Sequence, residues 1–168
     1  KAFGGGMPIS AIVGTREVMR HLRPEGRSEI SGTYLAHLTA VLAASAALDE
    51  YAQPGFYKRL EVLGKHFYGR FQDLIEQSGV PARLQYVGPR FGIYFGVRDK
   101  VKNYRQAATQ DSDMLHTFVA GCIRRGVYFH VAAHHGFGAA HTEADLTLAL
   151  DAIAGALEDV RRSFGVGS

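Results

Sequence analysis

The sequence predicts an α/β chain in two parts, the end of a larger sheet domain over residues 1–53 and a small α+β domain over residues 54–168. Three observations predict this. A β-branched apolar run and a long alanine-rich run open the chain, and their apolar faces need neighbours that the chain does not supply. A helix, two strands, a helix, a strand and a helix follow, which is the order of a small sheet with helices on one face. The composition, 46% hydrophobic and 21% charged, is that of a globular protein.

The elements of the first part are short except for the last one. Residues 9–13 are apolar and β-branched, and they predict a strand that ends at Gly14. Thr15 is placed to cap a short helix over residues 16–22. After a polar, glycine-punctuated loop, apolar residues recur with helical spacing over residues 37–51. Because this helix is apolar on most faces, we expect it to be deeply buried.

The second part alternates helices and strands. Pro54 and Gly55 break the chain, and an amphipathic pattern then predicts a long helix that ends at Gly79. Further runs predict three strands and two capped helices, the first capped by Asp111 or Ser112 and the last with Asp145 in the acidic place of a capping box. The expected bounds are residues 56–78 for the long helix, 83–87, 91–97 and 127–131 for the strands, and 112–125 and 143–164 for the other helices, with connections over 98–110 and 132–141.

Composition excludes several classes of protein. The formal net charge is only +3 and the basic residues are scattered, so we expect no nucleic-acid partner. No apolar run approaches the roughly 20 residues that span a bilayer, and we expect no membrane contact. The single cysteine, Cys122, cannot form an intrachain disulfide, which fits a cytoplasmic protein. Because Lys1 opens directly onto a triple glycine without an initiator methionine, we expect the C-terminal portion of a longer protein.

The N-terminal lysine has two interpretations. A free lysine has a pKa near ~10.4, so a catalytic lysine needs surroundings that lower its pKa or must already be held as an imine. Lys1 is followed after two residues by three glycines, which would let the backbone pass close to a flat cofactor. Alternatively, Lys1 is a solvated residue at the start of a flexible segment.

A hydroxyl-rich segment precedes the alanine-rich helix. Ser31, Gly32, Thr33 and Tyr34 lie just before its expected start. Hydroxyls and backbone amides near a helix N-terminus form a natural phosphate site. The alternative is that these hydroxyls simply cap the helix.

These two segments resemble motifs of class III pyridoxal-phosphate-dependent aminotransferases. Residues 1–11, KAFGGGMPISA, resemble the family's K-x-x-G-G-G-x-P-x-G-A segment, and Gly32-Thr33-Tyr34 resembles its G-T-[FY] segment. Residues 91–95, 126–128 and 140–145 are similar to the small C-terminal domain of the glutamate-semialdehyde aminomutase branch. The resemblance covers essentially the whole chain.

The resemblance implies a fold, a cofactor and roles for named residues. The chain would be the C-terminal part of a fold type I enzyme, with residues 1–53 ending the cofactor-binding large domain and residues 54–168 forming the small domain. Lys1 would form the internal aldimine (Schiff base) with pyridoxal 5'-phosphate and would act as the acid and base. Gly32 and Thr33 would bind the cofactor, with Thr33 contacting the cofactor of the neighbouring subunit in a homodimer.

Two stretches depart from the family's pattern. Residues 35–38 lack its glycine, asparagine and proline, and His37 in this stretch is interpreted as a structural histidine. Near residues 132–138 the aminomutase carries a glutamate, whereas this chain carries His134 and His135. We expect these histidines to contact the substrate, with a polar surface loop as the alternative. We expect no metal site, because adjacent histidines rarely present both rings to one ion.

The expected function is transamination between an amino acid or amine and a keto acid or aldehyde. An aminomutase or an amino-acid racemase on the same fold is the alternative within enzymes, and the glutamate missing near residues 132–138 argues against the aminomutase itself. The alternative of another class is an inactive fragment or an interaction subunit.

Overall fold

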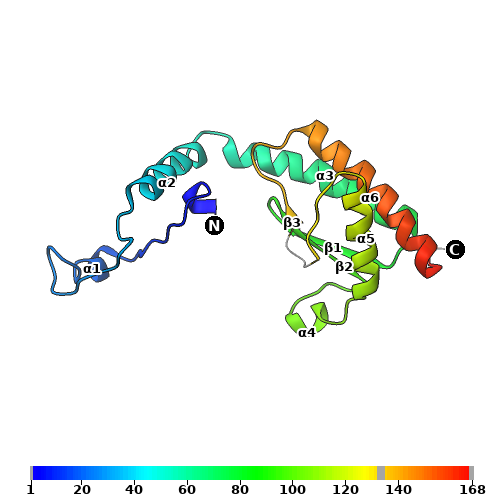
Figure 1. Cartoon of the computed structure of the whole chain (residues 1–168), viewed down its shortest axis with the longest axis horizontal. Helices are drawn as coiled ribbons and strands as arrows, with labels where there is room; N and C mark the ends of the chain where they lie inside the picture. The colour runs from blue at the N-terminus through cyan, green and yellow to red at the C-terminus, as the bar shows by residue number, and fades with distance from the viewer. Residues whose placement is uncertain (1, 132–134, 167–168) are drawn as a thin grey trace. The chain divides into compact units, whose positions relative to one another are not determined.

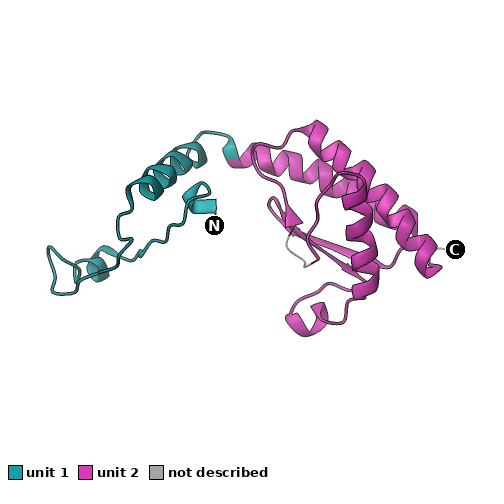
Figure 2. Cartoon of the chain, in the orientation of Figure 1, with its two compact units in different colours: residues 1–56 teal, residues 57–168 magenta. Residues whose placement is uncertain are grey.

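The computed structural model describes residues 2–131 and 135–166 as a chain of helices with one small sheet (Figure 1). Contacts divide it into two units, residues 1–56 and residues 57–168 (Figure 2). None of the helices in the described ranges combines the length and the apolar character that crossing a bilayer requires.

The first unit consists of one long helix and the irregular chain before it. Its elements are the 3-10 helix η1 (Ala2–Gly4), α1 (Arg16–Met19) and α2 (Leu38–Tyr51). The predicted cap is confirmed, since the Thr15 hydroxyl accepts a hydrogen bond from the backbone N–H of Val18 at 3.4 Å. The strand predicted over residues 9–13 is wrong, because no described residue pairs with it. A β-branched run becomes a strand only where another strand supplies hydrogen-bond partners.

Within this chain α2 is not deeply buried, which agrees with the expectation that its apolar faces need neighbours the chain does not supply. Its buried residues are Ala40 and Ala44, whereas its larger apolar side chains are exposed. The exposed residues are Leu38, Val41, Leu42 and Leu48. The described partner of α2 is the segment that starts with η1, and that segment packs against the small residues of the helix. One short segment cannot cover a helix that is apolar on several faces.

The second unit contains the remaining helices and the sheet. Its elements are α3 (Phe56–Ser78), β1 (Ala82–Val87), β2 (Arg90–Phe95), α4 (Tyr104–Ala107), α5 (Ser112–Arg124), β3 (His135–Gly136) and α6 (Glu143–Phe164). The three long helices and the hairpin confirm the sequence prediction. The caps are confirmed too: Asp111 accepts hydrogen bonds from two N–H groups at the start of α5, and Thr142 with Asp145 forms the capping box of α6.

The sheet has the order β1-β2-β3 and is antiparallel throughout. The third strand is not the one predicted over residues 127–131, which form no strand; it is the short β3 inside the predicted loop. Gly136 permits this pairing, because a Cβ there would lie 2.7 Å from the carbonyl oxygen of Pro89. The four-residue helix α4 is likewise absent from the sequence prediction and lies in the expected polar connection.

Aromatic side chains form the core on one face of this sheet. Phe91, Ile93 and Phe95 alternate along β2 and are buried. Phe67 of α3 lies 5.7 Å from Phe91, and Phe118 of α5 lies 5.2 Å from Phe95, measured between ring centroids. The helices therefore cover this face, and the alternate side chains of the strands lie on the opposite face.

Candidate functional site

The sequence-predicted site residues fall in three places. Gly32 and Thr33 lie in the first unit, just before α2, and His135 lies in the second unit, in β3. Lys1 and His134 lie outside the described residues.

Thr33 lines a hollow of about 730 Å³ in front of α2. Ser10, Ser31 and His37 add polar side chains to its wall, and Ile9 and Val41 are among the residues that add apolar surface. No aspartate or glutamate is present among the residues described as lining it, which are residues 8–10, 30–37, 40 and 41. A hollow with hydroxyls and no carboxylates suits an anionic group.

The N-terminus of α2 borders this hollow and has no side-chain cap. The N-cap residue is His37, and its side chain makes no capping hydrogen bond. Its Nδ1 lies instead 3.0 Å from the Thr39 hydroxyl. The interpretation of residues 31–34 as plain caps is therefore wrong. The first N–H groups of a helix have no partner within the helix, and together with the helix dipole they favour an anion.

The triple glycine has a structural reason that the sequence did not indicate. Gly5 and Gly6 have positive φ angles of 55° and 96°, which L side chains rarely adopt. A Cβ on Gly5 would lie 3.2 Å from the carbonyl oxygen of Ala43 in α2. These glycines thus let the chain turn and pack closely on α2. The Tyr51 hydroxyl at the end of the same helix donates a hydrogen bond of 2.6 Å to the Ala2 carbonyl.

His135 is buried in an aromatic environment. The residue is only 4% exposed, and its ring centroid lies 5.2 Å from that of Phe91 and 5.1 Å from that of Phe129. The surface-loop alternative is therefore wrong for His135. Its contact with a substrate stays a prediction, as does that of His134.

The start of α6, next in the chain, is fixed by local hydrogen bonds. The Nδ1 atom of His141 accepts a hydrogen bond from the N–H of Gly138 at 3.1 Å. The backbone N–H of Thr142 donates to the Asp145 carboxylate at 2.7 Å, and its hydroxyl donates at 2.8 Å. These hydrogen bonds lower the pKa of Asp145. Asp145 is therefore a charged capping group and a poor general acid.

Two other titratable groups are excluded from nucleophilic roles by burial. Burial raises the pKa of the Cys122 thiol to about 12, so the reactive thiolate is scarce at neutral pH. Burial, with a smaller effect of Tyr86, raises the pKa of Tyr68 as well, and its hydroxyl donates to the carbonyl of Gly88 at 3.0 Å. Across the described ranges, no group of three or more His, Cys, Asp or Glu side chains is placed to hold a metal ion.

Comparisons with known proteins place these features in a family. The family model described as "Aminotransferase class-III" matches residues 1–136. An omega-transaminase from Sphaerobacter thermophilus is 23% identical with a TM-score of 0.82, covering 95% of this chain and 37% of that chain. A beta-phenylalanine aminotransferase from Variovorax paradoxus is 21% identical with a TM-score of 0.85, covering 96% and 37%. A structure described as a transaminase with PLP bound is 19% identical with a TM-score of 0.79, covering 97% and 38%.

At these identities the solved structures establish the fold alone. The chain has part of the α/β fold of pyridoxal-phosphate-dependent transaminases, as expected from the sequence. It spans less than two fifths of the length of these three structures.

Proposed function

Because the chain belongs to the class III aminotransferase family, we propose that its protein transfers an amino group between an amino acid or amine and a keto acid or aldehyde. Pyridoxal 5'-phosphate is the cofactor of this family. The observation that carries the proposal is the family-model match, which covers residues 1–136 and so includes both Lys1 and Thr33. In addition, Thr33 lines a hollow that has no carboxylate among its described lining residues.

The surroundings of Thr33 fit the cofactor's phosphate group. The Thr33 hydroxyl would donate a hydrogen bond to a phosphate oxygen, and the uncapped N–H groups at the start of α2 would favour its negative charge. No described atom lies within 4 Å of the place where a Cβ on Gly32 would sit. The backbone of Gly32 is therefore open to close approach by a ligand.

Lys1 would carry the proton that is removed from the substrate's α-carbon. The cofactor, when bound, supplies the electron sink for chemistry at the substrate's α-carbon. The Nζ atom of Lys1, once neutral, would take the proton from that carbon and return it at the neighbouring cofactor carbon. Holding the amine beside the reacting atoms gives it an effective concentration that no free base reaches.

Packing within the first unit supports the proposed homodimer. Ala2 is hydrogen-bonded to Tyr51 in the last turn of α2, whereas Thr33 lies before the first turn. The 14 residues of α2 rise about 20 Å. We infer that Lys1 and Thr33 of one chain bind two different cofactor molecules, and that a second copy of the chain completes each cofactor site.

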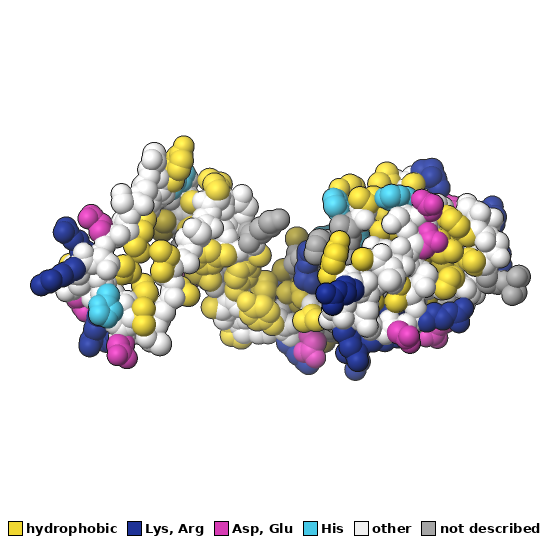
Figure 3. Space-filling view, turned by 90° about the horizontal axis from the view of Figure 1, so that it is seen from below, with side chains coloured by type: hydrophobic (Ala, Val, Ile, Leu, Met, Phe, Trp, Pro, Cys, Tyr) yellow, Lys and Arg dark blue, Asp and Glu magenta, His cyan; other side chains and the backbone are white. Residues whose placement is uncertain are grey.

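Exposed apolar surface supports the proposed domain assignment. Hydrophobic side chains occupy much of the visible surface of residues 1–56, at the left of Figure 3. Monomeric proteins rarely expose contiguous apolar surface of this kind. We assign residues 1–53 to the end of the cofactor-binding large domain, covered by the rest of that domain or by the partner, and residues 54–168 to the small domain.

The reaction is assigned as transamination rather than an aminomutase or racemase reaction. Residues 132–138 carry two histidines and no acid where the aminomutase carries its glutamate. We propose that His134 and His135 contact the substrate, with His135 doing so from a buried position. A coupled assay decides, because a transaminase turns over only with a second, amino-accepting substrate.

The proposal is tested by trapping the lysine. The purified protein with pyridoxal 5'-phosphate should show a visible absorption band that borohydride bleaches, and mass spectrometry should find the label on Lys1. Lys1→Ala should abolish the band, whereas Lys58→Ala, at an exposed lysine paired with Glu61, should retain it. Absence of the band, or a label on another lysine, would favour the inactive fragment or interaction subunit.

A second variant pair tests the phosphate contact. Thr33→Ala removes one hydrogen bond to a charged group and should weaken cofactor binding about tenfold. Thr109→Ala is the control, since Thr109 is not among the residues that line the hollow at Thr33 and its hydroxyl donates to the carbonyl of Gln106 in α4. Equal cofactor affinity in the two variants would contradict the role of Thr33.

A further inference from the structure

The outer face of the sheet in the second unit carries a hollow of about 480 Å³ that the proposed reaction does not use. Arg83 and Gln85 of β1 lie on this face, opposite to the aromatic core. In the ladder Gln85 pairs with Gly92, which has no side chain. The hollow itself runs along β1 from Arg83 to Val87, and Arg90, Phe91 and Lys100 complete its lining.

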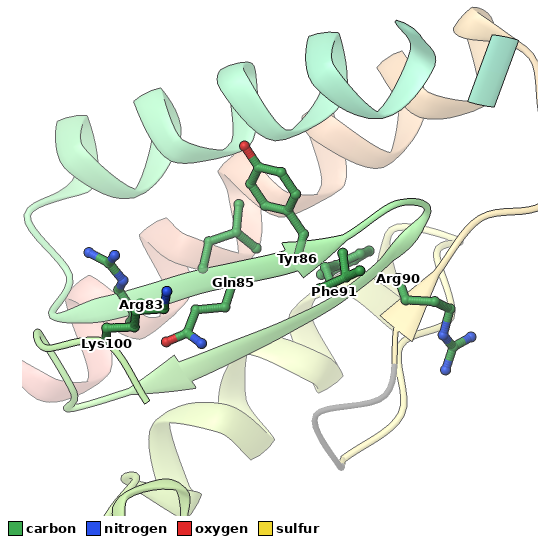
Figure 4. Close-up of a pocket in the computed structure, with 8 residues that line it drawn as sticks. Arg83, Gln85, Tyr86, Arg90, Phe91 and Lys100 are labelled. Carbon is green, nitrogen blue, oxygen red and sulfur yellow. The ribbon is translucent and has the colours of Figure 1, made fainter. Parts of the chain in front are cut away.

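Among the described residues that line this hollow, three are cations and none is a carboxylate. They are Arg83, Arg90 and Lys100, and none of them forms an ion pair with a described residue. Figure 4 shows Arg83 and Lys100 at one end, Gln85 in the middle and Arg90 at the other end. Like charges gathered without a counter-charge repel each other, so an anion bound here would be favoured.

The arrangement is preorganised by hydrogen bonds. The Gln85 side-chain amide accepts from the N–H of Val101 at 2.6 Å and donates to the Val101 carbonyl at 3.0 Å. This pair of bonds fixes the segment that carries Lys100 beside β1. The Nε atom of Arg83 is buried and has no hydrogen-bond partner among the described residues. A buried guanidinium N–H without an acceptor is costly, and a ligand oxygen would satisfy it.

We propose that this sheet face is a binding site for a small oxyanion ligand, a phosphate or carboxylate group held by Arg83 and Lys100. The body of the ligand would lie over Gln85 toward Arg90. The volume is within the range of small-molecule sites, roughly 300–1,000 Å³. The planar guanidinium of Arg83 matches either group in two-point contact, so the chemistry of the two ligand types is shared.

The site is tested by calorimetric titration of the purified, cofactor-loaded protein with inorganic phosphate and, separately, with succinate. Arg83→Gln and Lys100→Gln should each weaken binding of the preferred probe about tenfold. Arg98→Gln removes the same charge from an exposed neighbour outside the hollow and should change binding less than about twofold. Lys100 is exposed, so its variant tests the site even if Arg83→Gln unfolds the sheet.

The two probes and one further variant separate the outcomes. Tighter binding of phosphate identifies a phosphate ligand, and tighter binding of succinate identifies a carboxylate ligand. The proposal is overturned if neither probe binds, because the face is then filled by another part of the protein. It is also overturned if Thr33→Ala abolishes binding while Arg83→Gln and Lys100→Gln do not.

Discussion

Gly136→Ala should break the pairing that attaches β3 to β2. A Cβ on Gly136 would lie 2.7 Å from the Pro89 carbonyl oxygen and 2.9 Å from Cδ of Arg90. The first distance is shorter than real Cβ contacts, and Pro89 belongs to the two-residue turn between β1 and β2, so its backbone has little freedom to move. Overpacking of this kind costs about 1–3 kcal/mol. We therefore expect Gly136→Ala to lower the free energy of unfolding by about that amount.

Urea unfolding followed by circular dichroism measures this loss, and hydrogen exchange at Arg90 and Gly136 locates it. Gly138→Ala is the matched control, because no described atom lies within 4 Å of a Cβ at that position and its φ angle is not positive. The control should change stability by less than about 0.5 kcal/mol. If both variants unfold at the same urea concentration with unchanged exchange, the reasoning about Gly136 is refuted.

Two further predictions concern α6. Asp159 accepts hydrogen bonds from Arg125 at 2.7 Å and Arg124 at 3.0 Å, and the Arg125 hydrogen bond is the main cause of its lowered pKa. This stabilisation is complete above the unfolded-state pKa of about 3.9 and is lost as the pH falls through the folded pKa. The difference in unfolding free energy between the wild type and Asp159→Asn should therefore shrink below about pH 4. A difference that stays constant down to pH 2 would contradict this stabilising role of the Asp159 carboxylate. Thr142→Ala removes the N-cap hydrogen bond from the N–H of Asp145 and should lower the free energy of unfolding, measured in urea, by about 0.5–2 kcal/mol. Thr142→Ser keeps the hydroxyl and should restore stability. An equal loss of stability in both variants would contradict the capping role of Thr142.

Local chemistry explains which elements the sequence predicted. The helices α3, α5 and α6 carry their own periodicity and their own caps or terminal glycines, so a window of sequence contains the signal. The hairpin of β1 and β2 needs only two neighbouring runs and the Gly88-Pro89 turn between them. The family also followed from sequence, because residues 1–11 and 32–34 are a pattern of residue types at a fixed spacing.

The remaining strand pairing and the hollow on the sheet depend on residues that are distant from one another in sequence. Residues 9–13 and 127–131 have the composition of strands but no strand beside them, whereas His135 and Gly136 pair with β2 because Gly136 fits against Pro89. The proposed oxyanion hollow brings Arg83 of β1, Arg90 of β2 and Lys100 together through the β1–β2 pairing, which no short window of sequence shows. The sequence by itself determined the helices, the hairpin and the family, because those signals are local. The third strand, the burial of His135 and the uncapped N-terminus of α2 were decided by tertiary structure, because hydrogen-bond partners and packing neighbours come from elsewhere in the chain.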